Sequence, residues 1–98
     1  MTLTRYRGDT YPIVATLKVN NVVKDLTGAT ITFSYVSSSQ AKKTITGVIS
    51  DALGGEVMFI PSSEDFQVVG TYNYDIQYRL DDLIVTYDVG TVILKKDI

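Results

Sequence analysis

The sequence predicts an all-β fold, a sandwich of about seven antiparallel strands in a single domain over residues 1–98. Apolar and polar residues alternate with a period of two along most of the chain, which is typical of half-buried strands. Gly, Asn or Asp interrupts this alternation at intervals of about ten residues, as turns between short strands do. A length of 98 residues suits one core and leaves no room for a second.

The N-terminal strands are predicted from alternation and from turn residues. Residues 13–19 carry an apolar side chain at every second position, ending at Val19, and the pair Asn20-Asn21 provides a tight turn into Val22-Val23. After a break at Thr27-Gly28, residues 29–36 alternate Ile, Phe and Tyr with Thr and Ser. β-Branched and aromatic residues favour strands, so this second segment is also predicted to be one.

In the middle of the chain the sequence predicts strands with less regular alternation. Residues 37–40 form a polar loop, and residues 43–49 and 56–60, separated by the turn at Gly54-Gly55, are expected to form strands at a sheet edge. Residues 61–66 place serines ahead of acidic residues. This pattern predicts one short helical turn that crosses between the two sheets.

The most regular strand is predicted over residues 72–80, where Tyr, Ile and Leu alternate with polar residues. Asp81-Asp82 forms a two-residue turn, and residues 83–89 return with every second side chain on the same apolar face. The alternation changes phase around Gly90, which predicts a bulge there, and Val92 and Leu94 then take over the apolar face. The register predicts three cross-strand pairs: Leu80 with Leu83, Tyr78 with Val85, and Ile76 with Tyr87.

The segment Gly70-Thr71-Tyr72 resembles the tyrosine corner of immunoglobulin-like domains. In that feature a Tyr at the start of a late strand bonds upstream backbone through its hydroxyl, two residues before a cysteine position. Tyr72 would be the corner residue and Tyr74 would take the cysteine's place. The alternative is that Tyr72 is only a core aromatic. The order of crossing turn, glycine and strand favours the corner, and therefore an immunoglobulin-like sandwich.

The amino-acid composition excludes several classes of function. The chain contains no cysteine, histidine or tryptophan, which excludes a thiolate nucleophile, a Ser-His-Asp triad, a disulfide and the usual nitrogen or sulfur zinc site. We therefore expect no catalytic residue, no metal site and no cofactor. A net charge of −2, with scattered lysines, makes nucleic acid an unfavourable partner. No signal peptide or membrane-spanning segment is predicted, so no membrane association is expected.

Four short segments occur in a distinctive order: RGDTYPI at residues 7–13, VKDLTGATITF at 23–33, GEVMF at 55–59 and GTY at 70–72. The set resembles the N-terminal immunoglobulin-like domain of phage baseplate upper proteins and related small tail proteins. The resemblance implies a non-enzymatic virion protein, made in the bacterial cytoplasm, which forms a homo-oligomer and binds other phage tail proteins. The longer C-terminal region of the baseplate proteins is missing after residues 95–98, so the chain is either a small stand-alone phage protein or an excised domain.

Other functional interpretations of single motifs compete with simpler ones. Arg7-Gly8-Asp9 spells an integrin-binding tripeptide, but a Gly-Asp turn before a strand gives the same letters. The pair Glu64-Asp65 offers acid and base groups, yet a helix N-terminus favours the same negative charge. A calcium site lacks the spacing of a dedicated loop, and two of its four candidate ligands are predicted to face solvent. Those ligands are Asp75, Asp81, Asp82 and Asp88, of which Asp75 and Asp88 are the solvent-facing pair.

The seven tyrosines leave one further hypothesis open, a carbohydrate- or cell-surface-binding module on the same fold. Most of them alternate toward the predicted core, and only Tyr6 and Tyr11 are expected to be exposed contacts. The loops over residues 37–43 and 53–56 contain no aromatic platform for a sugar. This module therefore ranks second to the virion component, and an enzyme ranks third. The tyrosines assigned to the core are Tyr35, Tyr72, Tyr74, Tyr78 and Tyr87.

Overall fold

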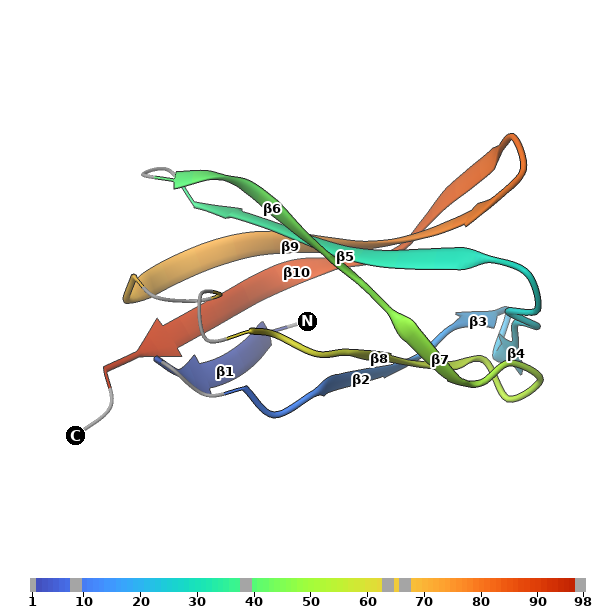
Figure 1. Ribbon diagram of the computed structural model, residues 1–98, viewed down its shortest axis with the longest axis horizontal. Coiled ribbons are helices and arrows are strands. Elements are labelled where there is room, and N and C mark those ends of the chain that lie inside the picture. Colours follow the sequence, from blue (N-terminus) through green and yellow to red (C-terminus); the bar gives the residue numbers. More distant parts are fainter. Residues whose placement is uncertain (1, 8–9, 38–39, 63–64, 66–67, 97–98) are drawn as a thin grey trace.

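The computed structural model describes residues 2–7, 10–37, 40–62, 65 and 68–96. These residues form ten strands in three sheets and no helix, which confirms the predicted all-β sandwich (Figure 1). The larger sheet faces the smaller one, and the core lies between them.

The larger sheet has five strands in the order β1-β10-β9-β5-β6. All neighbours are antiparallel except β1 and β10, which run parallel, with Thr2 beside Thr91 and Tyr6 beside Lys95. The parallel pairing of β1 and β10 differs from the prediction that all strands are antiparallel. No strand was predicted at residues 2–6, because Arg5 occupies an inward position and breaks the apolar alternation. The bounds are β1 (Thr2–Tyr6), β5 (Thr30–Ser37), β6 (Gln40–Thr46), β9 (Gly70–Leu80) and β10 (Leu83–Lys95).

The smaller sheet has the order β2-β8-β7, and a separate hairpin pairs β3 with β4. The bounds are β2 (Ile13–Thr16), β3 (Lys18–Val19), β4 (Val22–Val23), β7 (Val48–Asp51) and β8 (Glu56–Phe59). Asn20 and Asn21 have φ values of 53° and 66°, as a type I′ turn requires, so the predicted hairpin is confirmed. Val19 is nevertheless 46% exposed instead of facing the core, because the hairpin is a separate two-stranded sheet at one end of the sandwich (Figure 1).

The predicted single strand at residues 43–49 is two strands, β6 and β7, which belong to different sheets. The chain changes sheet at Gly47, whose N–H donates a 2.7 Å hydrogen bond to the Ile31 carbonyl. A Cβ at residue 47 would lie 2.5 Å from Cγ2 of Val57, so only glycine fits this crossing. β6 and β7 are edge strands as expected, whereas β8 lies in the centre of its sheet and corrects the edge prediction for residues 56–60.

The register of β9 and β10 confirms two predicted pairs and corrects the third. Leu83 lies opposite Leu80 and Val85 opposite Tyr78, but Ile76 lies opposite Asp88. The bulge falls between Thr86 and Asp88 and not around Gly90, and the extra residue, Tyr87, packs edge-to-face against Tyr78. The phase therefore changes early. Asp88 takes an inward position, and Val89, predicted to be apolar core, is 65% exposed.

The core consists of the inward side chains of both sheets and is rich in aromatic rings. Phe33 stacks on Tyr74 with centroids 4.9 Å apart and contacts Phe59 at 5.5 Å. Such pairs add to the apolar burial that holds a sandwich without disulfides. Of the tyrosines assigned to the core, four are buried and Tyr87 is half-buried. The buried apolar residues are Ile13, Leu17, Leu26, Ile31, Phe33, Tyr35, Ile45, Val57, Phe59, Tyr72, Tyr74, Ile76, Tyr78, Val92 and Leu94.

The tyrosine corner is confirmed, because the Tyr72 hydroxyl donates a hydrogen bond to the Val68 carbonyl four residues upstream. The predicted helical turn at residues 61–66 includes residues 63, 64 and 66, which lie outside the described residues. Within the described part, the Ser62 and Asp65 backbones form a turn, with the Asp65 N–H 3.0 Å from the Ser62 carbonyl. The predicted loop at residues 37–40 also falls in part outside, at residues 38–39, and its outer residues belong to β5 and β6.

Candidate functional site

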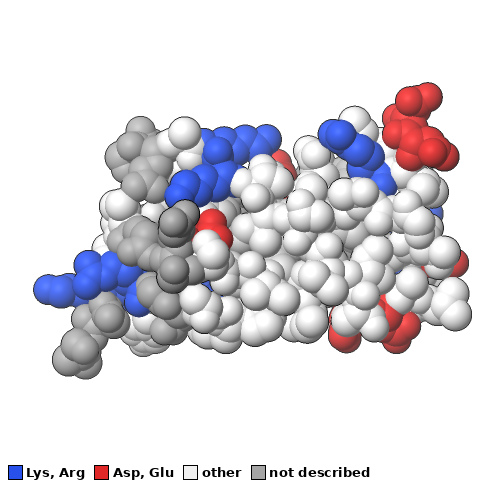
Figure 2. Space-filling view, in the orientation of Figure 1, with Lys and Arg blue, Asp and Glu red and all other residues white. Residues whose placement is uncertain are grey.

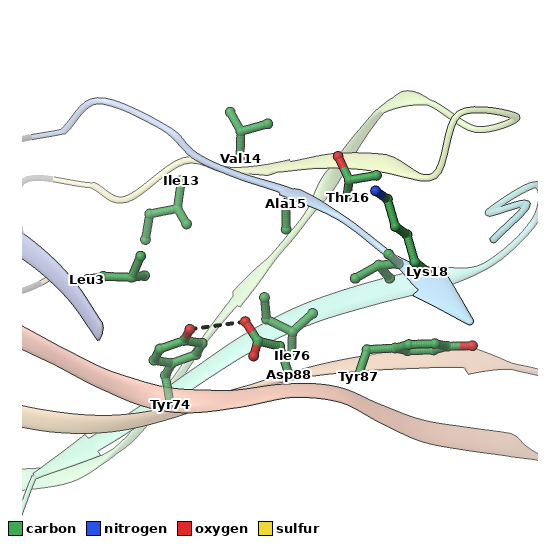
Figure 3. Close-up of a pocket in the computed structure, with 11 residues that line it drawn as sticks. Leu3, Ile13, Val14, Ala15, Thr16, Lys18, Tyr74, Ile76, Tyr87 and Asp88 are labelled. Carbon is green, nitrogen blue, oxygen red and sulfur yellow. Dashed lines mark hydrogen bonds between the residues drawn. The ribbon is translucent and has the colours of Figure 1, made fainter. Parts of the chain in front are cut away.

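A groove of about 330 Å³ runs along the edge strand β2 on the open side of the sandwich. One wall is the consecutive backbone of residues 13–18, and the other is built from β9 and β10, with Leu3 of β1 at one end (Figure 3). β1 covers β10 only from Thr91 to Lys95, which leaves the earlier part of β10 uncovered on this side. The remaining lining residues are Tyr74, Ile76, Tyr87 and Asp88.

A carboxylate lies at the floor of this mostly apolar groove. The Tyr74 hydroxyl donates a 3.0 Å hydrogen bond to Oδ2 of Asp88 (Figure 3). Burial, together with the hydrogen bond to Asp88 and the negative charge of Asp88, raises the pKa of Tyr74 to about 12. Asp88 was predicted to face solvent, and the bulge before it is the reason that it faces inward. The change of phase in the alternation of apolar and polar residues indicates this bulge, but the bulge was predicted around Gly90.

The free edge of β2 presents backbone groups to this groove. The Leu17 N–H donates a 2.9 Å hydrogen bond to the Gly55 carbonyl, on the side of β8. Hydrogen-bonding direction alternates along an antiparallel strand, so the N–H and C=O groups of Val14 and Thr16 point away from β8. No described strand lies on that side of β2. The edge is therefore able to accept a further strand.

The outer face of the smaller sheet carries an apolar row across its three strands. Val14, Met58 and Val48 are register partners, and the two valines are 57% and 52% exposed. Figure 2 shows a broad uncharged area in the middle of the molecule in this view, with blue side chains mainly at one end and red ones mainly at the other. Contiguous exposed apolar surface of this kind marks a site of contact with another protein.

The N-terminal segment presents two exposed tyrosines, as predicted. Tyr6 is 48% exposed and Tyr11 is 51% exposed. The guanidinium of buried Arg5 lies 3.9 Å from the ring centroid of Tyr11 and donates a 2.7 Å hydrogen bond to its carbonyl. This contact attaches the segment to the sandwich, and a role for the two tyrosines in binding stays a prediction. In the Arg-Gly-Asp motif, Gly8 and Asp9 lie outside the described residues.

The candidate calcium ligands are not brought together. Asp75 lies on the outer face of the larger sheet, Asp88 lies in the groove, and Asp81 and Asp82 form the β9–β10 turn. Among the described residues no group of three or more acidic side chains is placed to hold a metal ion. Of the pair Glu64-Asp65, the glutamate lies outside the described residues, and Asp65 accepts hydrogen bonds from the Tyr35 hydroxyl and from the Ser62 N–H.

The loops of the carbohydrate hypothesis lie at opposite ends of the sandwich, after β5 and after β7. The exposed tyrosines belong to neither of them. In the described part of the chain, no helix is long and apolar enough to cross a membrane.

Residues 2–93 match the BppU N-terminal domain family. The chain belongs to this family. The match confirms the resemblance to phage baseplate upper proteins that four ordered segments had suggested. The BppU N-terminal domain is a structural domain of the phage baseplate. A comparison with curated proteins gives no match.

The fold of this BppU N-terminal domain is similar to that of the "N-terminal domain of phage TP901-1 ORF48", with a TM-score of 0.71. The two chains are 17% identical, and the alignment covers 98% of this chain and 86% of the other. At this identity the likeness concerns the fold alone.

Proposed function

We propose that this BppU N-terminal domain is a non-enzymatic structural component of a phage or prophage virion. It is held in the tail or baseplate by contacts with copies of itself and with other tail proteins. The observation that carries the proposal is the family match over residues 2–93, since the family is a structural domain of the baseplate. The virion is accordingly its site of action, after synthesis in the cytoplasm of the bacterial host.

The surface of the domain supports a role in contacts. In the row of Val14, Met58 and Val48 on the smaller sheet, the two valines are exposed and Met58 is half-buried between them, next to the free edge of β2. The outward face of β5, β6 and β9 in the larger sheet is different, because it presents mainly Thr, Ser, Gln, Lys and Arg side chains. Burial of an apolar row gives a driving force for association, whereas a hydroxyl-rich face is already well hydrated. The smaller sheet is therefore the contact face.

Light scattering and co-purification with tail proteins test this proposal. We expect the wild-type domain to form an oligomer at high concentration or to retain other tail proteins from induced host cells. Val48→Lys places a charge in the apolar row and should weaken these contacts. Thr46→Lys is the matched control, because it adds the same charge two residues away on the outer face of the other sheet. A strict monomer without tail-protein partners would contradict the proposal.

A further inference from the structure

We propose that an extended segment of another protein adds as a strand to the free edge of β2, with a lysine or arginine side chain directed to Asp88. Its outward side chains are apolar and extend the row that begins at Val14. The inference rests on the proposed function, because it names the surface and the partner chemistry for one of the protein contacts.

The topology leaves a strand position open at this edge. Immunoglobulin-like domains place strands A, B, E and D in one sheet and C, F and G in the other. Here β2, β8 and β7 occupy the places of B, E and D, and β5, β9 and β10 those of C, F and G. β1 precedes β2 in the chain but pairs with β10. The place of strand A beside β2 therefore holds no described strand.

The backbone at this edge is oriented for strand addition. The N–H and C=O groups of Val14 and Thr16 point away from β8, by the alternation that the 2.9 Å bond from Leu17 to Gly55 fixes. A peptide that pairs with these two residues satisfies both donors and both acceptors. Main-chain hydrogen bonds supply affinity in such complexes, and alternate side chains supply specificity.

The groove behind the edge selects a basic side chain. Tyr74 is the hydrogen-bond donor to Asp88 among the described residues, and a carboxylate has acceptor positions for further donors. Lys18 lines the same groove, but Figure 3 shows its ammonium turned toward Thr16 and away from Asp88. A negative charge in a partly desolvated apolar groove is stabilised by an incoming cation.

A second copy of this chain fits the groove less well. In an edge-to-edge pair of two β2 strands, the inward side chains would be Ile13 and Ala15, which carry no charge for Asp88. A partner segment that alternates apolar residues with one inward Lys or Arg satisfies both the groove and the apolar row. We take the occupant to be a segment of a different protein, because a symmetric pair of two β2 strands leaves Asp88 without a cation.

The test selects binding segments from a random peptide library on the isolated domain and measures the affinity of the consensus peptide. Asp88→Asn should weaken binding by about ten-fold or more, since it removes one partner of a buried charged pair. Asp75→Asn is the matched control, because it removes the same charge from the outer face, and should change affinity by less than about two-fold. Val14→Pro removes an edge N–H without disturbing β8 and should abolish binding.

Several results would overturn this inference. One is that the wild-type domain enriches no peptide. Another is that the consensus peptide contains no Lys or Arg and binds the Asp88→Asn variant as tightly as the wild type. A wild-type dimer that Val14→Pro dissociates would assign the edge to a second copy. If Val14→Pro does not fold, amide chemical shifts of Val14 and Thr16 on peptide addition locate the site instead, and shifts elsewhere contradict it. A domain found in virions that binds no peptide would refute only this inference, leaving the virion role intact.

Discussion

The Tyr74 hydroxyl donates its hydrogen bond to Asp88 across the bulge of β10, with 3.0 Å between the two oxygen atoms. The Tyr74 ring stacks on Phe33 in the core at 4.9 Å. A single side chain thus connects the centre of the sandwich to the floor of the groove.

Replacement of Tyr74 by phenylalanine keeps the ring and removes the hydroxyl. We expect Tyr74→Phe to lower the free energy of unfolding by about 1–2 kcal/mol, because Asp88 loses its donor in a partly buried place. Urea denaturation measures the change. Tyr78→Phe is the control, since Tyr78 is equally buried on the same strand and its hydroxyl bonds no described residue; it should cost less than about 0.5 kcal/mol. Equal losses in the two variants would show that the hydrogen bond contributes nothing.

Alkaline pH should destabilise the domain through Tyr74. Its pKa is raised from 10.0 to about 12 in the folded state, so the unfolded chain releases this proton first. The associated stability is fully present below pH 10 and is lost as the pH rises toward 12. Denaturation at a series of pH values should show a slope in this window that is smaller in Tyr74→Phe. A slope of the same size in the variant would assign the effect to other tyrosines, such as Tyr72, whose pKa burial also raises.

The crossing of the chain at Gly47 should not tolerate alanine. A Cβ there would lie 2.5 Å from Val57 and 2.9 Å from Phe59, both fully buried. We expect Gly47→Ala to destabilise the domain by about 1–3 kcal/mol through overpacking, as thermal unfolding would show. Thr46→Ser, at the exposed preceding position, should stay within about 0.5 kcal/mol of the wild type. Wild-type stability in Gly47→Ala would mean that the two sheets can separate at this point without cost.

The contact between Arg5 and Tyr11 should contribute modestly to stability. Tyr11→Leu removes the ring over which the guanidinium lies at 3.9 Å, and the expected loss is about 0.5–1 kcal/mol. Tyr6→Leu is the matched control, because Tyr6 is exposed to nearly the same degree. Calorimetric unfolding of the two variants gives the comparison. A larger loss for Tyr6→Leu would place the anchor of the N-terminal segment elsewhere.

The alternation of apolar and polar residues with a period of two predicted the fold well wherever a strand has one face exposed to solvent. The strands around Phe33 and Tyr74, the Asn20-Asn21 turn and the Tyr72 corner all follow from local residue chemistry, and the structure has each of them. The division of residues 43–49 between two sheets was not predictable in the same way. Its cause at Gly47 is a close approach to side chains of β8, which are distant in the sequence.

The groove was missed for a related reason. The displacement of Asp88 to the inner face depends on where the β10 ladder gains its extra residue, and the sequence places the change of phase only within a few positions. The parallel strand β1 was missed because Arg5 holds an inward position that alternation assigns to an apolar residue. Both errors concern polar residues that occupy inward positions, Arg5 in the core and Asp88 in the groove.

The central claim is that this domain is built into a phage particle through protein contacts. Immunogold electron microscopy of particles purified from induced host cells tests it most directly, with an antibody against the domain. The account predicts label at the tail or baseplate, and loss of that label when the Val48→Lys variant replaces the wild type. Particles that assemble complete tails and carry no label, while the protein remains in the unassembled fraction, would contradict it.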